Sequence, residues 1–318
     1  MHTDDRPDLS VIVVTHNGRD LALETLQGAR AAAGAIDVQW LVVDSGSSDD
    51  TPDAIGRAWD DVTVLRRPNI GFAAANNVAL AEARGRYVLL LNPDVAVASG
   101  TLADLVDALD ARPEVGAASV VQRAPDGSSQ ASARRFPSPA RELAEALLVA
   151  RIPFARRAGA ADAPPIDDAT ERSVDWLVGA FLAVRREALA AVGGLDERFF
   201  LYSEEKDLCF RIRRAGWDVR HLPVMAVVHH CGGYERPELR AQLAYSKLLF
   251  ADKHLGRARR TAYRCALTLR HLIRVVGLAP AATRAGGGGR MRGELAALRV
   301  AVGAGGPPIQ REDHSLAP

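Results

Sequence analysis

The sequence has 318 residues, 48% of them hydrophobic and 25% charged, with a formal net charge of +1. This length supports one large α/β domain or two small ones, and the composition excludes an intrinsically disordered chain. A net charge so close to zero argues against a protein that binds nucleic acid over much of its surface, so we expect no nucleic-acid partner.

The charge is unevenly distributed along the chain. Residues 256–300 contain ten arginines and one acid, Glu294, so this stretch contributes +9 and the remainder sums to −8. Such asymmetry is typical of a basic appendage on a neutral or acidic body. We therefore predict a catalytic domain over 1–255 and a basic helical tail with a flexible C-terminus over 256–318.

The sequence carries no sign of export or membrane insertion. The N-terminus MHTDDRPDLS is polar and acidic, and no apolar run approaches the ~18 residues that a membrane span requires. The three cysteines, Cys209, Cys231 and Cys265, are odd in number and irregularly spaced, which fits neither a disulfide framework nor a zinc site. We expect a cytoplasmic protein.

The first half of the chain alternates short apolar runs with alanine-rich segments of helical periodicity. The runs have the length and Val, Leu and Ile content of strands buried on both faces, and they predict parallel strands joined by crossover helices. The expected strands are 9–15, 38–44, 62–66 and 87–91, and the expected helices lie near 19–33, 52–59, 72–84 and 101–111. The fold class is therefore α/β, a doubly wound and mainly parallel sheet, which binds ligands at the carboxyl ends of its strands.

The second half is less regular. Residues 123–172 are rich in Pro, Ser, Ala and Arg, and we expect loop and short helices there, which could form a lid. The pattern then predicts a strand over 174–185, a helix over 186–192 and a helix over 237–254, followed by the basic tail.

Asp44 is the first candidate site residue. It ends a predicted strand and begins the turn D-S-G-S-S-D-D-T, which leads into a helix. Its carboxylate could accept a hydrogen bond from a nucleobase while the turn amides face phosphate or ribose. An Asx-turn that caps the helix explains the same residues equally well.

Asp94 is a candidate metal ligand. It follows the strand YVLLL in the turn Asn92-Pro93-Asp94, and the proline stiffens that turn. A carboxylate in this position suits Mg²⁺ or Mn²⁺, although an isolated turn of this type is more often structural. We favour the metal because Asp44, Asp94 and His229 all fall at strand ends; the pattern does not decide between His229 and His230.

Glu204, Glu205 and Asp207 form an acidic cluster between aromatic residues. A carboxylate among aromatic side chains has a raised proton affinity and suits a general base. The alternative is a solvated, salt-bridged start of a helix, and composition alone does not separate the two.

Taken together, seven segments resemble the family-2 glycosyltransferases of GT-A fold, in that family's order and over about two-thirds of the chain. They are VIVVTHNG (11–18), VVDSGSSDDT (42–51), NIGFAAANN (69–77), YVLLLNPDV (87–95), VGAFLAVRREAL (178–189), GGLDERFFLYSEEKDLCFRIRRAGW (193–217) and VVHH (227–230). The resemblance implies a nucleotide-sugar half over about 9–122 and an acceptor and catalytic half over about 174–255.

The resemblance also implies a role for each candidate residue. The expected nucleotide-binding residues are Thr15, Asn17, Asp44, Asn69 and Gly71; the expected ligands of Mg²⁺ or Mn²⁺ are Asp94 and His229; Trp176, Gly179 and Ala180 would floor the acceptor site; Glu204 and Glu205 would be the catalytic pair. It implies a single inverting displacement in which Glu205 removes the proton of the acceptor hydroxyl.

The segment DGSSQASARRFPS (126–138) is similar to the rhamnosyltransferase branch of that family. That branch implies transfer of L-rhamnose from dTDP-rhamnose to a lipid-linked or cell-envelope glycan. The basic tail contains TAYRCALTLRHLIRVV, which predicts an amphipathic helix that lies on an anionic leaflet at the inner face of the plasma membrane or packs on the catalytic domain.

Four positions depart from the family pattern. Ser45 replaces Asn, Glu205 replaces Asp, Lys206 replaces a hydrophobic residue and could lower the pKa of Glu205, and Tyr234 replaces Ser or Thr. The changes at 205 and 206 keep open a sugar-nucleotide-binding protein of the same fold with impaired catalysis. A nucleotidyltransferase is a further alternative, although THNGRD is a poor triphosphate loop, and the absence of G-x-G-x-x-G disfavours a dehydrogenase.

Overall fold

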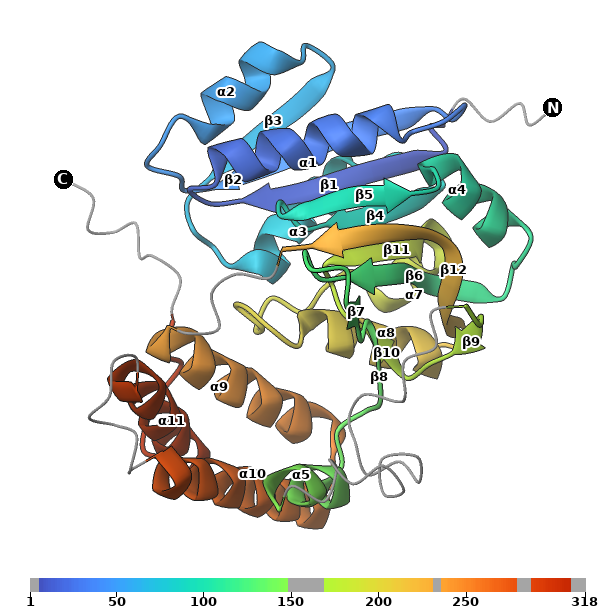
Figure 1. Ribbon diagram of the computed structural model, residues 1–318. Helices are drawn as coiled ribbons and strands as arrows, with labels where there is room; N and C mark the ends of the chain where they lie inside the picture. The colour runs from blue at the N-terminus through green and yellow to red at the C-terminus, as the bar shows by residue number, and fades with distance from the viewer. Residues whose placement is uncertain (1–5, 148–168, 231–235, 279–286, 310–318) are drawn as a thin grey trace.

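The computed structural model describes residues 6–147, 169–230, 236–278 and 287–309, and a mixed β-sheet forms its central layer (Figure 1). Eight strands follow the order β3-β2-β1-β4-β11-β6-β12-β5, while β7 pairs with β6 and β9 with β12. Their bounds are β1 Leu9–Thr15, β2 Val38–Ser45, β3 Val62–Arg67, β4 Tyr87–Leu91, β5 Val95–Ser99, β6 Val115–Arg123, β7 Ser129–Gln130, β9 Arg172–Ser173, β11 Phe181–Arg185 and β12 Asp218–His229.

Six of these eight strands run in one direction. β3, β2, β1 and β4 pair in parallel, as do β6 and β12, whereas β11 and β5 run antiparallel to their neighbours. The register sets Thr15 beside Asp44 and Val13 beside Leu91. The loops that follow β1, β2 and β4 therefore meet at one edge of the sheet, and the mainly parallel sheet predicted from the sequence is confirmed.

Helices cover both faces of the sheet, because successive side chains of β1 point to opposite sides. Val11 and Val13 pack with the helices on one face, and Ile12 and Val14 with those on the other. The first face carries α1 (Arg19–Ala31), α2 (Thr51–Ala58) and α4 (Leu102–Asp110); the second carries α3 (Phe72–Glu82), α7 (Arg186–Val192) and α8 (Glu204–Arg214).

Four further helices form a layer below the sheet in Figure 1, which we call the helical layer. They are α5 (Pro139–Ala146), α9 (Pro237–His254), α10 (Arg257–Leu278) and α11 (Gly287–Ala301). Their core includes Leu248 of α9, Tyr263 and Leu267 of α10, and Ala297 of α11, all buried. The basic tail is thus a packed part of the protein that shares its core with α9. Among the helices described, none is long and apolar enough to cross a membrane.

The single strand predicted over 174–185 is wrong. β9 ends at Ser173, β10 (Trp176–Leu177) pairs with β8 (Ala133–Arg134) in a separate two-stranded sheet, and the central strand β11 starts only at Phe181. The chain bends at Gly179, where a Cβ would stand 3.3 Å from the Cβ of Glu205. Continuous hydrophobicity concealed this break because β10 and β11 are both apolar and almost entirely buried.

Two strands of the main sheet, β5 at its edge and β6 in its interior, were not predicted from the sequence. Their sequences, VAVAS and VGAASVVQR, contain Ala, Gly and Ser, which have weak strand preference, and only pairing with β12 and β11 makes them strands. Within 123–172 the structure describes β7, β8 and α5; residues 148–168 lie outside the described part, so the lid stays a prediction.

Candidate active site

A cavity of about 740 Å³ lies at the carboxyl ends of β1 and β4, bounded by the starts of α8 and α9. Ten of the twelve residues singled out in the sequence line it: Thr15, Asn17, Asn69, Gly71, Asp94, Gly179, Ala180, Glu204, Glu205 and His229. Asp44 and Trp176 do not. Segments from residue 14 to residue 239 thus converge on one hollow, as expected of an α/β ligand site.

Asp44 is buried behind the cavity wall, which Ser45 forms at this point. Its Oδ2 accepts a hydrogen bond of 3.1 Å from the Ser47 amide, and its Oδ1 is buried without a partner among the described residues. The neighbouring Thr15 Oγ1 is in the same condition. The Asx-type turn is therefore present, and among the described residues it engages only one of the two carboxylate oxygens.

Asn17 joins the ends of β1 and β2. Its backbone has a positive φ of 50°, its amide donates to Ser47 Oγ at 2.9 Å, and its Oδ1 accepts from the Ser48 amide at 2.7 Å. His16 adds a 2.8 Å bond between Nδ1 and the Ser45 carbonyl and also lines the cavity. These hydrogen bonds connect the loop after β1 to the loop after β2 at the edge of the cavity.

Gly71 lies where the start of α3 contacts Phe200, shortly before Glu204 and Glu205 in the sequence. Its φ of +89° suits glycine, and a Cβ there would lie 2.7 Å from the Phe200 carbonyl oxygen. The Phe72 amide donates to that same carbonyl at 2.7 Å, and Asn69 Oδ1 accepts from the Gly71 amide at 3.3 Å. Residues 69–72 and 200 are therefore in direct backbone contact.

Three hydrogen bonds position the turn that carries Asp94. The Asn92 amide donates to the Ala180 carbonyl at 2.9 Å, Thr25 Oγ1 to the Pro93 carbonyl at 2.9 Å, and the His230 amide to the Asp94 carbonyl at 3.0 Å. The last bond ties the end of β12 to this turn and brings His229 to the cavity, whereas His230 does not line it.

The pair formed by Asp94 and His229 fits a divalent ion that completes its shell with substrate oxygens. His229 Nε2 lies 3.5 Å from Asp94 Oδ1, and both side chains reach the cavity. Within the described ranges no group of three or more His, Cys, Asp or Glu side chains could hold a metal alone. A carboxylate and an imidazole beside an open cavity match ions that are shared with phosphates.

Glu204 and Glu205 begin α8, after Tyr202 and Ser203, whose φ angles are 68° and 69°. Left-handed backbone at two non-glycine residues is costly and clusters at functional sites. Each glutamate keeps Oε2 buried without a partner in the described part of the chain. Burial raises the pKa of both carboxyls, and the charge of Glu205 raises the pKa of Glu204 further.

Lys206 points away from the cavity. Its Nζ donates to Ser203 Oγ at 3.1 Å and lies 4.8 Å from the ring centroid of Trp176. Its charge lowers the pKa of Glu205, as expected, but burial outweighs it and the net shift is upward. Trp176, whose Nε1 donates to the Arg135 carbonyl at 2.8 Å, packs behind Lys206 and does not floor the cavity.

Asp207, the third acid of the cluster, is fully buried and serves the fold. It lies 2.7 Å from Arg211 Nε, 2.7 Å from Lys253 Nζ and 2.6 Å from His254 Nε2. Burial alone would raise its pKa, but these hydrogen bonds and charges lower it. Asp207 therefore anchors α8 to α9, and it does not line the cavity.

The structure adds cavity residues that sequence patterns did not indicate. Arg236, Glu238 and Leu239 come from the start of α9, and Ile309 from the C-terminal segment. No motif marks them, since only the packing of the helical layer brings them to the sheet edge. Of these residues, only Arg236 has a recognisable sequence feature: it is a cation directly before a helix that begins with Pro237.

This topology, with a cavity at the carboxyl ends of parallel strands, is that of an α/β enzyme. Residues 10–169 match the family described as Glycosyl transferase family 2. The chain is 34% identical over 266 residues to the N-acetylglucosaminyl-diphospho-decaprenol L-rhamnosyltransferase of Mycobacterium tuberculosis, covering 78% of this chain and 85% of that protein. The protein belongs to glycosyltransferase family 2 and is a glycosyltransferase.

Further comparisons agree with this assignment. Rhamnosyltransferase WbbL of Escherichia coli is 26% identical over 168 residues, 50% of this chain and 61% of that protein. The mannosyltransferase PcManGT of Pyrobaculum calidifontis, solved with GDP-Man and Mn²⁺, shares the fold with a TM-score of 0.56 at 20% identity, over 93% of this chain and 86% of its own. The predicted GT-A fold is thereby confirmed.

Proposed function

We propose that the protein is an inverting, metal-dependent rhamnosyltransferase that moves L-rhamnose from dTDP-rhamnose to a hydroxyl of a lipid-linked or cell-envelope glycan. The names of the relatives from M. tuberculosis and E. coli support the sugar, and the first of them supports the lipid-linked acceptor. The observation that carries the catalytic part is the buried, unpartnered Oε2 of Glu205 beside the cavity.

On the donor side, the chain's own groups bind and orient the nucleotide. Asp44 Oδ1 and Thr15 Oγ1 lack partners among the described residues at the paired ends of β1 and β2, so a nucleobase or ribose can satisfy them. The bonds between Asn17 and residues 47–48 fix the surrounding loop before a ligand arrives. Such preorganisation reduces the entropic cost of binding.

On the acceptor side, Glu205 acts as the general base. Its raised pKa gives the carboxylate a proton affinity suited to deprotonating a hydroxyl as that oxygen attacks the anomeric carbon. Glu204 lies beside it in the cavity, where burial and the charge of Glu205 raise its pKa, and its carboxyl group can hydrogen-bond to the acceptor. Gly179 packs against the Glu205 side chain and leaves room for the sugar.

Asp94 and His229 would hold Mg²⁺ or Mn²⁺, and a bound ion neutralises the charge of the diphosphate leaving group. The solved PcManGT complex with GDP-Man and Mn²⁺ supports this choice of ion. Direct attack by the acceptor oxygen needs no covalent glycosyl-enzyme intermediate and therefore no nucleophile from the protein.

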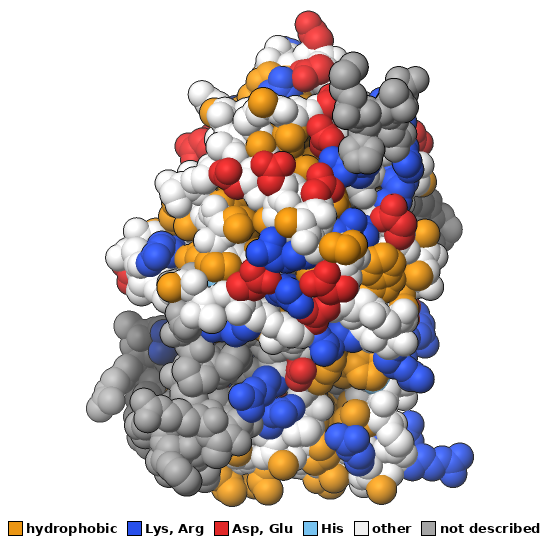
Figure 2. Space-filling view, turned by 90° about the vertical axis from the view of Figure 1, so that its right-hand side faces the viewer, with side chains coloured by type: hydrophobic (Ala, Val, Ile, Leu, Met, Phe, Trp, Pro, Cys, Tyr) orange, Lys and Arg blue, Asp and Glu red, His pale blue; other side chains and the backbone are white. Residues whose placement is uncertain are grey.

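The helical layer offers a surface for peripheral membrane binding. Among the described residues, six of the seven exposed large hydrophobic side chains lie there: Leu143, Leu147, Leu272, Val276, Leu295 and Val302. Figure 2 shows hydrophobic side chains at the lower end of the molecule with lysines and arginines beside them. Apolar side chains among cations suit an anionic leaflet, so we place the enzyme at the cytoplasmic face of a membrane.

The proposed activity is tested with a panel of nucleotide-sugars, with and without Mg²⁺ or Mn²⁺, by following release of the nucleotide diphosphate. We expect dTDP-rhamnose to give metal-dependent release, increased by a lipid-linked glycan, with an inverted linkage in the product. Binding without release under any condition would instead identify a catalytically impaired sugar-nucleotide-binding protein. Release of inorganic pyrophosphate from a nucleoside triphosphate would identify a nucleotidyltransferase.

A further inference from the structure

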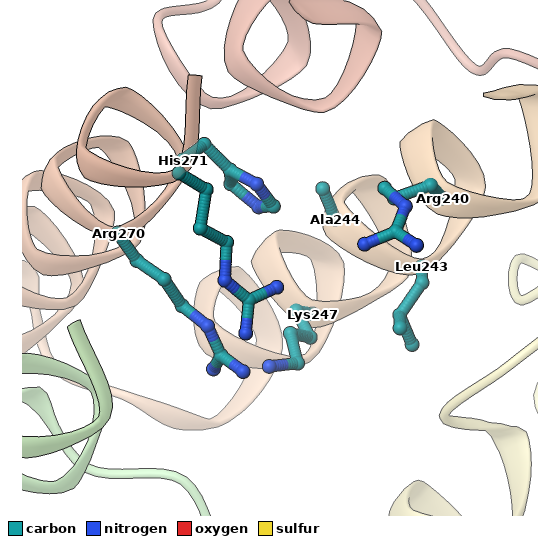
Figure 3. Close-up of a pocket in the computed structure, with 7 residues that line it drawn as sticks. Arg240, Leu243, Ala244, Lys247, Arg270 and His271 are labelled. Carbon is teal, nitrogen blue, oxygen red and sulfur yellow. The ribbon is translucent and has the colours of Figure 1, made fainter. Parts of the chain in front are cut away.

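A second cavity, of about 240 Å³, lies between α9 and α10 of the helical layer and is lined mainly by cations. Arg240 and Lys247 reach it from α9, and Arg270, His271 and Arg274 from α10. Figure 3 shows the nitrogens of Arg270 and Lys247 close together, with the Arg240 guanidinium facing the same space from across. The volume is several times the ~30 Å³ that one water molecule occupies in the liquid.

Among the described residues, two carboxylates form ion pairs with these cations. Glu142 pairs with Arg270 at 2.7 Å and Lys247 at 3.4 Å, while Glu294 pairs with Arg240 at 2.6 Å and Arg274 at 3.3 Å. Over these six side chains, four positive and two negative charges leave +2, and the charge of Glu145, which also acts on Arg270, reduces this excess. His271 Nδ1 lies 2.6 Å from Glu294 Oε2, and burial lowers the pKa of the imidazole although Glu294 opposes the shift.

The cations around this cavity also repel one another electrostatically. Burial, and then the charge of Arg270, lower the pKa of Arg274. Arg270 Nε is buried without a hydrogen-bond partner among the described residues. A bound anion would relieve the repulsion and accept that unused donor, because guanidinium groups bind phosphate oxygens with directional, charge-assisted hydrogen bonds.

Helix α9 separates this cavity from the active site. Its first residues, Glu238 and Leu239, line the catalytic cavity, while Arg240 and Lys247 line the cationic one. Leu239 and Arg240 are consecutive residues, so the two cavities approach each other at the start of α9, and Lys247 lies ~12 Å further along the helix at a rise of about 1.5 Å per residue.

We infer that the cationic cavity binds a phosphate or diphosphate group, either free in solution or on a lipid. This site is separate from the donor cavity, and its existence does not depend on the proposed rhamnosyl transfer.

The first experiment uses the three lysines of the unaltered full-length protein, Lys206, Lys247 and Lys253. The protein is acylated with and without inorganic pyrophosphate, in the absence of divalent ions, and labelling of each lysine is measured by mass spectrometry. Lys247 and Lys253 lie on the same helix with similar side-chain exposure, 18% and 20%. We expect pyrophosphate to protect Lys247 several-fold more than Lys253; equal protection, or none, would overturn the inference.

The second experiment compares Arg274→Gln with Arg260→Gln by titration calorimetry with pyrophosphate. Both arginines lie on α10 with similar side-chain exposure, 40% and 44%, but only Arg274 lines the cavity. We expect Arg274→Gln to weaken pyrophosphate binding by about tenfold or more, because a charge-assisted hydrogen bond is lost. Wild-type affinity in Arg274→Gln, or an equal loss in Arg260→Gln, would contradict the site.

The source of the anion is decided by flotation with vesicles of phosphatidylcholine, alone or with a polyprenyl monophosphate. If the site holds a lipid phosphate, the added lipid increases recovery of wild type and Arg260→Gln but not of Arg274→Gln. If it holds a free anion, the added lipid changes nothing and pyrophosphate binding persists. Absence of both responses in the wild-type protein would refute the inference.

Discussion

His229 Nε2 lies 3.5 Å from Asp94 Oδ1 across the active-site cavity, although the two residues are 135 positions apart in the sequence. The hydrogen bond from the His230 amide to the Asp94 carbonyl maintains this approach, because it ties the end of β12 to the turn after β4. A carboxylate and an imidazole so close together could both coordinate one divalent ion, and the first prediction tests this arrangement.

Asp94→Ala is expected to abolish most activity together with the dependence on added divalent ion, since the leaving diphosphate loses its counter-charge. His229→Ala should retain some activity but need more metal for half-maximal rate. Rates are measured against Mn²⁺ concentration, with His230→Ala as the matched control because His230 does not line the cavity. Near-normal, EDTA-sensitive turnover in Asp94→Ala would exclude Asp94 as a ligand.

Glu205→Gln should reduce kcat by ~10²–10⁴ with donor affinity unchanged, because the general base is removed while the donor side is untouched. Glu204→Gln should raise the acceptor KM more than it lowers kcat. Steady-state kinetics with both substrates varied separates the two roles, and exchanged effects would assign the base to Glu204. Asp207→Asn should chiefly lower the melting temperature, because Asp207 pairs with Arg211, Lys253 and His254.

The pH dependence of kcat/KM should show an acid limb shifted above the ordinary glutamate pKa of 4.5, because burial raises the pKa of Glu205. The base works only when ionised, so activity is lost as pH falls through the raised pKa and recovers as pH rises above it. The profile is recorded at saturating metal, and Glu205→Gln should lack this limb. An acid limb centred below 4.5 would show that a different group titrates.

Gly179→Ala should lower kcat by roughly tenfold, because a methyl group 3.3 Å from the Glu205 Cβ displaces the base by tenths of an ångström and an error of 1 Å can cost 10²-fold. Gly56→Ala is the matched control, since a Cβ there meets nothing within 4 Å. Both variants are assayed for donor binding and turnover. Unchanged kcat in Gly179→Ala would show that Glu205 tolerates displacement.

Replacing Leu272 and Val276 by Gln in the full-length protein should reduce recovery with anionic vesicles several-fold. These side chains are 47% and 65% exposed, on the face of α10 opposite the buried Leu267. Leu21→Gln serves as the control in flotation, since Leu21 is 45% exposed on α1, where it lines the active-site cavity and is not part of the helical layer. Equal recovery of all three proteins would argue against membrane binding through this surface.

The apolar runs alone located the four parallel strands β1 to β4. β1 and β4 begin and end where the apolar runs do, because strands buried on both faces are continuous hydrophobic segments with polar residues only at their ends. Those same ends carry Thr15 and Asp94, so a local pattern was enough to place both at the sheet edge.

Which of the other candidate site residues line the cavity depends on packing between distant parts of the chain. Glu204, Glu205 and Asp207 are alike in sequence, yet the first two line the cavity while Asp207 is enclosed by cations from α8 and α9. Trp176 lies behind Lys206, and the strand predicted through Gly179 is broken where Glu205 packs against it. These outcomes depend on contacts between residues far apart in the chain, which no local pattern of polarity encodes.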